Sequence, residues 1–158
     1  IGFEKGVPVS VDGAALPPVK LIEMLNKIGG RCAVGRFDVV ENRISGRKTR
    51  ELYEAPAAAI LIAAHRALES ITLDRESMHF REPLSIKYAE MVYEGKWYVP
   101  LREGLDSLFT RLNENATGEV RVQLFRGGLT ILGRRSPHTL FQPRDSGPQV
   151  QFPQRLTV

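Results

Sequence analysis

Several features that would assign a protein to a specialised class are missing from these 158 residues. Cys32 is the single cysteine, which excludes an internal disulfide. No apolar run approaches the roughly 20 residues that a membrane helix needs. His65, His79 and His138 show no metal-ligand spacing with one another or with Cys32. These absences predict a soluble, cytoplasmic protein that has no metal site and no membrane partner.

The net charge says little about partners. Lys and Arg number 22 against 18 Asp and Glu, but acidic residues are interspersed among the basic ones along the chain. No continuous basic track follows, so nucleic acid is not the expected partner. A basic nucleic-acid-binding module stays an alternative, and its affinity would fall steeply with salt.

Length and hydrophobic content predict one domain with a real core. With 42% hydrophobic residues, the chain can bury about two thirds of its unfolded surface. Residues 1–141 carry the periodic patterns and form the expected domain. Residues 142–158 are rich in proline and have no periodicity, so we expect an extended, partly disordered tail. The chain begins at Ile1 without a methionine or a signal peptide, so we expect that further sequence precedes it.

Changes in the apolar period predict an α+β fold, with a largely antiparallel sheet and several packed helices. The expected elements, in chain order, are a hairpin over 1–11, a loop over 12–16, a helix from Pro17 to Gly29, two strands within 34–56, a buried helix over 57–71, helical segments on either side of Pro83 up to Gly95, a helix over 101–115, and a closing hairpin around 126–128.

Glycine, proline and capping residues set the expected boundaries of the helices. Gly29 and Gly30 should end the first helix. Either Thr72 or Asp74 can cap the helix that follows residue 71, because both side chains can accept bonds from the free backbone donors of a first turn. Pro83 should bend or break that helix, because proline lacks the backbone N–H.

The segment from Val34 to Pro56, VGRFDVVENRISGRKTRELYEAP, combines strand-forming residues with dense charge. Within each strand, alternate residues are expected to lie on one face. They are Phe37, Val39, Glu41 and Arg43 on the first strand and Arg47, Thr49, Glu51 and Tyr53 on the second. On spacing alone, a solvated ladder of cross-strand ion pairs is favoured over a binding site.

The register of these strands decides which side chains meet. A turn centred on Arg47 would place Glu41 opposite Tyr53, where both side chains can touch one small polar ligand. A turn at Ile44–Ser45 would instead separate the two by about five residues, or roughly 17 Å, which is too far for a shared ligand without a bend. We expect the first register.

Seven groups of short motifs occur in one order along the chain up to about Leu140. They are F-x-x-G-x-P-V at 3–9, L-I-x-x-L-N-x-I-G-G at 21–30, G-R-x-D-x-V-E-N-R with K-[ST]-R and Y-E-x-P within 34–56, A-H-R-A-L-E at 64–69, L-D-R-E at 73–76, Y-A-E-x-V-Y-x-G-x-W at 88–97, and L-x-G-R-x-S-P at 132–137. In this order they resemble the argininosuccinate synthase family, whose members join citrulline to aspartate with ATP. Several motifs in one order are far more specific than any one of them.

The resemblance implies that Glu41 and Tyr53 occupy the positions of the family's citrulline-binding glutamate and tyrosine. A carboxylate suits the α-ammonium group of an amino acid. A phenol can bond to a carboxylate or ureido group while its ring covers the carbon chain. These are binding roles, so no catalytic acid or base is assigned.

The resemblance also implies a reaction and its partners. The family adenylates the citrulline ureido oxygen with ATP, with Mg²⁺ expected beside the nucleotide, and the aspartate amine then displaces AMP. Its nucleotide site is a Ser-Gly-Gly-x-Asp loop in an N-terminal domain, and this sequence contains no such loop. The chain is therefore expected to be the C-terminal catalytic and multimerisation domain, to bind no ATP and to be inactive alone, and to assemble as a homotetramer.

Three places beside the expected site depart from the family pattern. Cys32-Ala33 stands where the family has His-Gly, Glu51 where it has glycine, and Ala55 where it has the threonine of E-T-P. Ala33 restricts a backbone position that glycine would leave free. A divergent, non-catalytic paralogue that acts as a binding or oligomerisation module is therefore the alternative.

Overall fold

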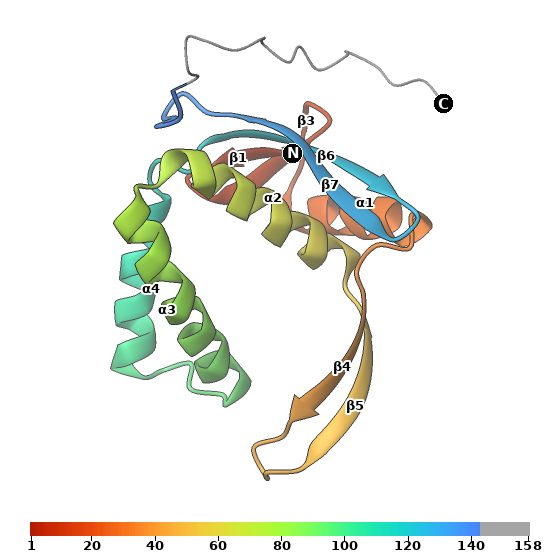
Figure 1. The fold of residues 1–158 in the computed structure, drawn as a ribbon, viewed down its shortest axis with the longest axis vertical. Coiled ribbons are helices and arrows are strands. Elements are labelled where there is room, and N and C mark those ends of the chain that lie inside the picture. The colour runs from red at the N-terminus through yellow and green to blue at the C-terminus, as the bar shows by residue number, and fades with distance from the viewer. Residues whose placement is uncertain (143–158) are drawn as a thin grey trace.

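The computed structural model describes residues 1–142 and confirms an α+β fold (Figure 1). Its elements are β1 (Gly2–Glu4), β2 (Val7–Val11), β3 (Ala14–Ala15), α1 (Pro18–Arg31), β4 (Arg36–Asn42), β5 (Lys48–Glu54), α2 (Pro56–Thr72), α3 (Arg75–Tyr93), α4 (Pro100–Asn113), β6 (Gly118–Phe125) and β7 (Gly128–Arg135). The tail expected over residues 142–158 lies, apart from Gln142, outside the described residues.

An antiparallel sheet with the order β3-β2-β1-β6-β7 is built from the two ends of the described chain. The turns Lys5–Gly6 and Arg126–Gly127 have positive φ at both residues, a conformation that matches the twist of tight hairpins. Both hairpins are therefore as predicted. The loop expected over 12–16 is wrong in part, because Asp12 and Gly13 also take positive φ and return the chain as β3 against β2.

Helices α1 and α2 supply most of the core. α2 packs against β6 and β7, and α1 packs against β2 and α2. Ile60, Ala64 and Leu68 recur at helical spacing along α2 and are at most 1% exposed, as their pattern predicts. Two buried clusters meet at Ile1 and Leu61, which pack against both.

Gly29 and Gly30 do not end the first helix, which continues through them to Arg31. A Cβ atom at position 29 would come within 2.7 Å of the Cβ atom of Pro56. Gly29 therefore serves the close approach of α1 to the start of α2, and the expected stop signal is wrong.

Pro83 does not break α3, which is assigned as one helix over Arg75–Tyr93. Of the two expected caps, Asp74 begins this helix, accepting a hydrogen bond from Ser77 N at 3.0 Å. Turns on both sides of Pro83 are held by other helices, since Arg81 pairs with α2 and Tyr88 bonds to α4. These contacts offset the missing backbone hydrogen bond.

Two arms extend from the body formed by the sheet, α1 and α2 (Figure 1). One is the β4–β5 hairpin, which connects α1 to α2. The other is the α3–α4 pair, which connects α2 to β6 and is held by the edge-on contact of Tyr88 with Phe109. Among residues 1–142, no helix is long and apolar enough to cross a membrane.

Ala33 sits in the left-handed region, with a φ of 57°, at the turn between α1 and β4. We predict that Ala33→Gly raises the free energy of unfolding by about 1 kcal/mol, because glycine adopts this conformation without the steric penalty of a Cβ atom. Urea unfolding followed by circular dichroism measures the change.

The matched control for Ala33→Gly is Ala58→Gly, the same substitution at an exposed position inside α2. There glycine should lower the free energy of unfolding by about 1 kcal/mol. If both variants lose stability equally, the strain at Ala33 has been overstated.

Candidate functional site

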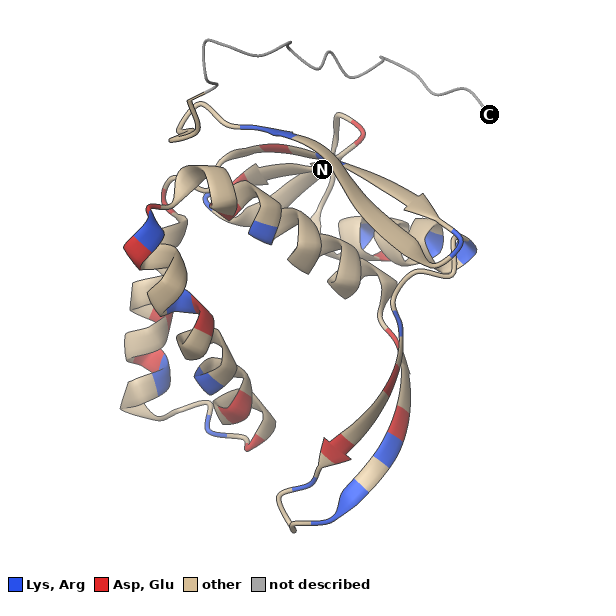
Figure 2. Cartoon of the chain, viewed as in Figure 1, with Lys and Arg blue, Asp and Glu red and all other residues tan. Residues whose placement is uncertain are grey.

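The β4–β5 hairpin concentrates charge of both signs on an extended arm (Figure 2). On one face, Arg36 pairs with Glu54 at 2.9 Å and Arg50 pairs with Asp38 at 2.6 Å. All four side chains are more than half exposed, so these pairs form the solvated ladder that the charge pattern predicts. The opposite face carries Glu41 and Tyr53.

The observed register pairs Glu41 with Thr49 and Tyr53 with Phe37. The predicted opposition of Glu41 and Tyr53 is therefore wrong. The turn closes earlier than expected, because Gly46 takes a φ of 80° there. The expected assignment of residues to the two faces is confirmed, since this register keeps all the odd-numbered residues together.

Glu41 and Tyr53 nevertheless touch. Glu41 lies four residues from Phe37, the partner of Tyr53, which is about 13 Å along the strand. The Tyr53 hydroxyl donates a hydrogen bond to Glu41 Oε1 across this diagonal. The twist of a two-stranded ribbon and the length of both side chains bridge the separation. The structure thus brings together the two predicted residues in a register that differs from both of those considered from the sequence.

Arg43 completes a cluster around Glu41. Its Nε donates to Thr49 Oγ1 at 2.8 Å, and its Nη2 donates to Glu51. Its Nη1 lies 3.3 Å from Glu41 Oε2. That oxygen is buried and accepts no hydrogen bond from any described residue. The guanidinium is therefore bonded to one carboxylate and only near the other.

Arg43 and Glu51 each stabilise the charged form of the other. Tyr93, at the end of α3, and Glu51 raise the pKa of Arg43, so the guanidinium stays charged. The hydrogen bond from Thr49, together with Arg43, lowers the pKa of Glu51. A cluster with two carboxylates and one guanidinium carries a net negative charge, which suits a cationic group.

Comparison with known proteins shows the family to which the chain belongs. Residues 1–152 match the family described as Arginosuccinate synthase C-terminal domain. The chain belongs to the argininosuccinate synthase family. It is 56% identical over 141 residues to the argininosuccinate synthase of Symbiobacterium thermophilum, an alignment that covers 89% of this chain and 35% of that protein.

Two further relatives agree with this assignment. The argininosuccinate synthase of Koribacter versatilis is 48% identical over 143 residues, covering 90% of this chain and 35% of the relative. The chloroplastic argininosuccinate synthase of Arabidopsis thaliana is 48% identical over 142 residues, covering 90% and 29%. The chain thus spans about a third of the length of the curated relatives it matches. The expected resemblance to this family is confirmed.

From the hydrogen bond between Tyr53 and Glu41 we predict how the stability of this member of the argininosuccinate synthase family depends on pH. The bond raises the pKa of Tyr53 above its ordinary value of 10.0. Because the folded pKa is raised, the contact stabilises the protein below about pH 10 and is lost as the pH rises through the raised pKa. An ultraviolet titration of tyrosinate should show one tyrosine moving to lower pH in Glu41→Ala, which removes the acceptor of this bond.

Tyr53→Phe identifies the tyrosine in that titration, because it should remove the shifted component altogether. Tyr88 provides an internal reference, since its raised pKa comes from Asp106 and should not respond to position 41. A Glu41→Ala titration that superimposes on the wild type would contradict the contact.

Sequence reasoning placed Arg43, Thr49 and Glu51 on the right face but assigned none of them to the site. The signal was present, because an arginine and a glutamate on one face of a hairpin are natural partners for each other. Tyr93 lies 50 positions from Arg43 in the chain, so no spacing in the sequence could have indicated its effect on the pKa of Arg43.

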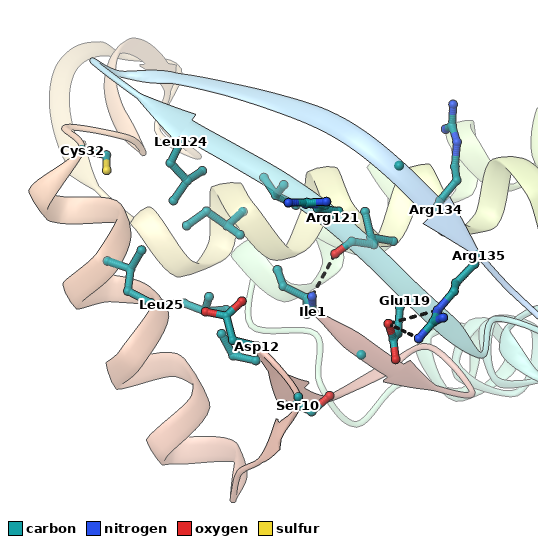
Figure 3. A pocket seen from close by; sticks show the side chains of 18 residues that line it. Ile1, Ser10, Asp12, Leu25, Cys32, Glu119, Arg121, Leu124, Arg134 and Arg135 are labelled. Atoms are coloured by element: carbon teal, nitrogen blue, oxygen red, sulfur yellow. Dashed lines mark hydrogen bonds and ion pairs between the residues drawn. The ribbon is translucent and has the colours of Figure 1, made fainter. Parts of the chain in front are cut away.

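Three cavities lie elsewhere among residues 1–142. In one of about 810 Å³, between α1 and the sheet, two pairs of polar groups are bonded to each other: the Ile1 nitrogen donates to Val120 O at 2.8 Å, and Arg135 donates to Glu119 at 2.8 Å (Figure 3). The others, of about 560 and 710 Å³, lie beside α2. None of the three is lined by residues of β4 or β5. These three cavities are therefore separate from the Glu41 cluster.

Proposed function

We propose that this chain is the C-terminal part of an enzyme of arginine biosynthesis that ligates citrulline and aspartate with ATP, releasing AMP and pyrophosphate. The observation that carries the proposal is the hydrogen-bonded pair of Glu41 and Tyr53 beside Arg43, in a chain that belongs to the argininosuccinate synthase family. The proposed contribution of this chain is to bind citrulline and to assemble subunits.

In this proposal Glu41 binds the α-ammonium group of citrulline, and Tyr53 orients the substrate. A carboxylate accepts strong, charge-assisted bonds from an ammonium group. The bond from Tyr53 holds Glu41 Oε1 in place, and the ring of Tyr53, which is 43% exposed, offers an apolar surface to the carbon chain. Neither residue transfers a proton to a reacting atom.

ATP and aspartate are proposed to bind to the part of the enzyme that this chain does not contain. The sequence lacks the Ser-Gly-Gly-x-Asp loop, so we assign no residue here to the nucleotide or to Mg²⁺. When bound, ATP supplies the activation of the ureido oxygen. The share of this chain in catalysis is to hold citrulline in a fixed position for that step, which reduces the entropy lost on the way to the transition state.

We also propose that residues 1–141 form one catalytic and multimerisation domain and that the enzyme is a cytoplasmic homotetramer. Large apolar side chains on the α3–α4 arm support assembly, because Phe80, Ile86 and Tyr98 are 64%, 61% and 89% exposed. Surfaces of this kind mark protein contacts more often than nucleic-acid contacts.

Calorimetry on the complete protein tests the proposed function. Citrulline should bind, and argininosuccinate should form when aspartate and ATP are added. Failure to bind citrulline would favour the non-catalytic paralogue. Binding to nucleic acid that weakens steeply with salt would instead favour the basic binding module.

A further inference from the structure

Arg43 lies next to the oxygen atom of Glu41 that a cationic ligand would contact. Its Nη1 is 3.3 Å from Glu41 Oε2, and that oxygen is shielded from solvent. The other oxygen already accepts a hydrogen bond from Tyr53. An ammonium group that binds Glu41 Oε2 must therefore either share this oxygen with the guanidinium or displace it.

Glu51 offers Arg43 another partner. Arg43 Nη2 bonds to Glu51 Oε1, and Nε donates to Thr49 at 2.8 Å, so two of its bonds point away from Glu41. The contact with Glu41 lacks hydrogen-bond geometry, although the two charged groups are close. The side chain of Glu51 is 29% exposed and that of Glu41 is 24% exposed, so the two carboxylates are similarly placed to hold the same cation.

We propose that Arg43 competes with the ammonium group of the substrate for Glu41, and that Glu51 shifts this competition toward the substrate by holding Arg43. This inference rests on the proposed function, because it takes Glu41 as the ammonium contact. Without Glu51, the nearest carboxylate for Arg43 is Glu41, and the guanidinium fork turns onto Oε2. Substrate binding would then leave a guanidinium without a carboxylate partner. Glu51 is thus a positioning residue that acts through Arg43.

A double-mutant cycle tests the competition, with the dissociation constant of citrulline for the complete protein measured by calorimetry. Glu51→Ala should weaken binding about fivefold, the size expected for a partly exposed ion pair. Arg43→Met removes the competitor and should bind citrulline at least as tightly as the wild type. In the Arg43→Met background, Glu51→Ala should then have almost no effect.

The cycle separates this mechanism from a simple attraction between Glu51 and the substrate. A direct attraction would make Glu51→Ala equally harmful with and without Arg43, and that result would overturn the proposal. So would an unchanged affinity in Glu51→Ala. Circular dichroism and thermal melting of each variant identify any loss of folding, which would otherwise lower the apparent affinity.

Glu41→Gln, measured in the same series, distinguishes failure of the inference from failure of the proposed function. If Glu41→Gln does not weaken citrulline binding, Glu41 is not the ammonium contact and both ideas fail. If Glu41→Gln weakens binding but the effect of Glu51→Ala does not depend on Arg43, only the competition is wrong.

Discussion

Glu41→Gln is expected to raise the KM for citrulline about 30-fold in the complete enzyme, the factor for losing a hydrogen bond between two charged groups. Glutamine keeps the size and the acceptor oxygen of Glu41, so the hydrogen bond from Tyr53 can persist. The change therefore removes the charge with little effect on shape. Steady-state kinetics with citrulline and ATP varied in turn measure the two KM values separately.

The KM for ATP should stay within about twofold of the wild-type value, since a lost ground-state contact affects the substrate that made it. Asp38→Asn is the matched control, because it is the same acid-to-amide change on the same strand but on the opposite face, where Asp38 pairs with Arg50 at 2.6 Å. It should leave both KM values unchanged. An equal rise in the KM values for citrulline and ATP in Glu41→Gln would argue against the assigned role.

The hairpin shows which parts of a site a sequence can specify. Period-two alternation assigns residues to faces, and the face that carries Glu41, Glu51 and Tyr53 was predicted correctly. The register depends on where the turn closes, and a segment containing Ser45 and Gly46 allows more than one turn. Whether Glu41 and Tyr53 meet then depends on side-chain reach and strand twist, which the sequence pattern does not report.

In the helices too, the local sequence predicts some features, and packing against other elements decides the rest. The apolar repeat of α2 predicts its burial, because only one packing arrangement hides so continuous a stripe. Gly29 and Pro83 are strong local stop signals, yet both lie within helices. In each case a neighbouring element decides the outcome: Pro56 packs closely over Gly29, and helices on either side hold the turns around Pro83.

Glu69→Ala is expected to lower the free energy of unfolding by about 3 kcal/mol, because it removes the buried member of an ion pair and, within residues 1–142, leaves Arg81 with only Glu82, at 4.0 Å, as a carboxylate neighbour. Glu69 is 3% exposed on α2. Its Oε1 lies 2.7 Å from Arg81 Nε on α3, and its Oε2 lies 3.4 Å from His65 Nδ1. Arg81 also lies over the ring of Phe109, 5.9 Å from its centroid, so this one carboxylate is linked to α2, α3 and α4. Urea unfolding measures the loss.

Glu82→Ala is the control for that experiment, because it removes the same charge at an exposed position. Glu82 also joins α2 to α3, through a 2.8 Å contact with Arg66, but both side chains are more than half exposed. Its removal should change the free energy of unfolding by less than about 1 kcal/mol. Replacing Glu69 and Arg81 together by leucine should recover part of the loss, because no buried charge is then left alone. If Glu69→Ala proves as mild as Glu82→Ala, the link between α2 and the α3–α4 arm depends on apolar packing instead.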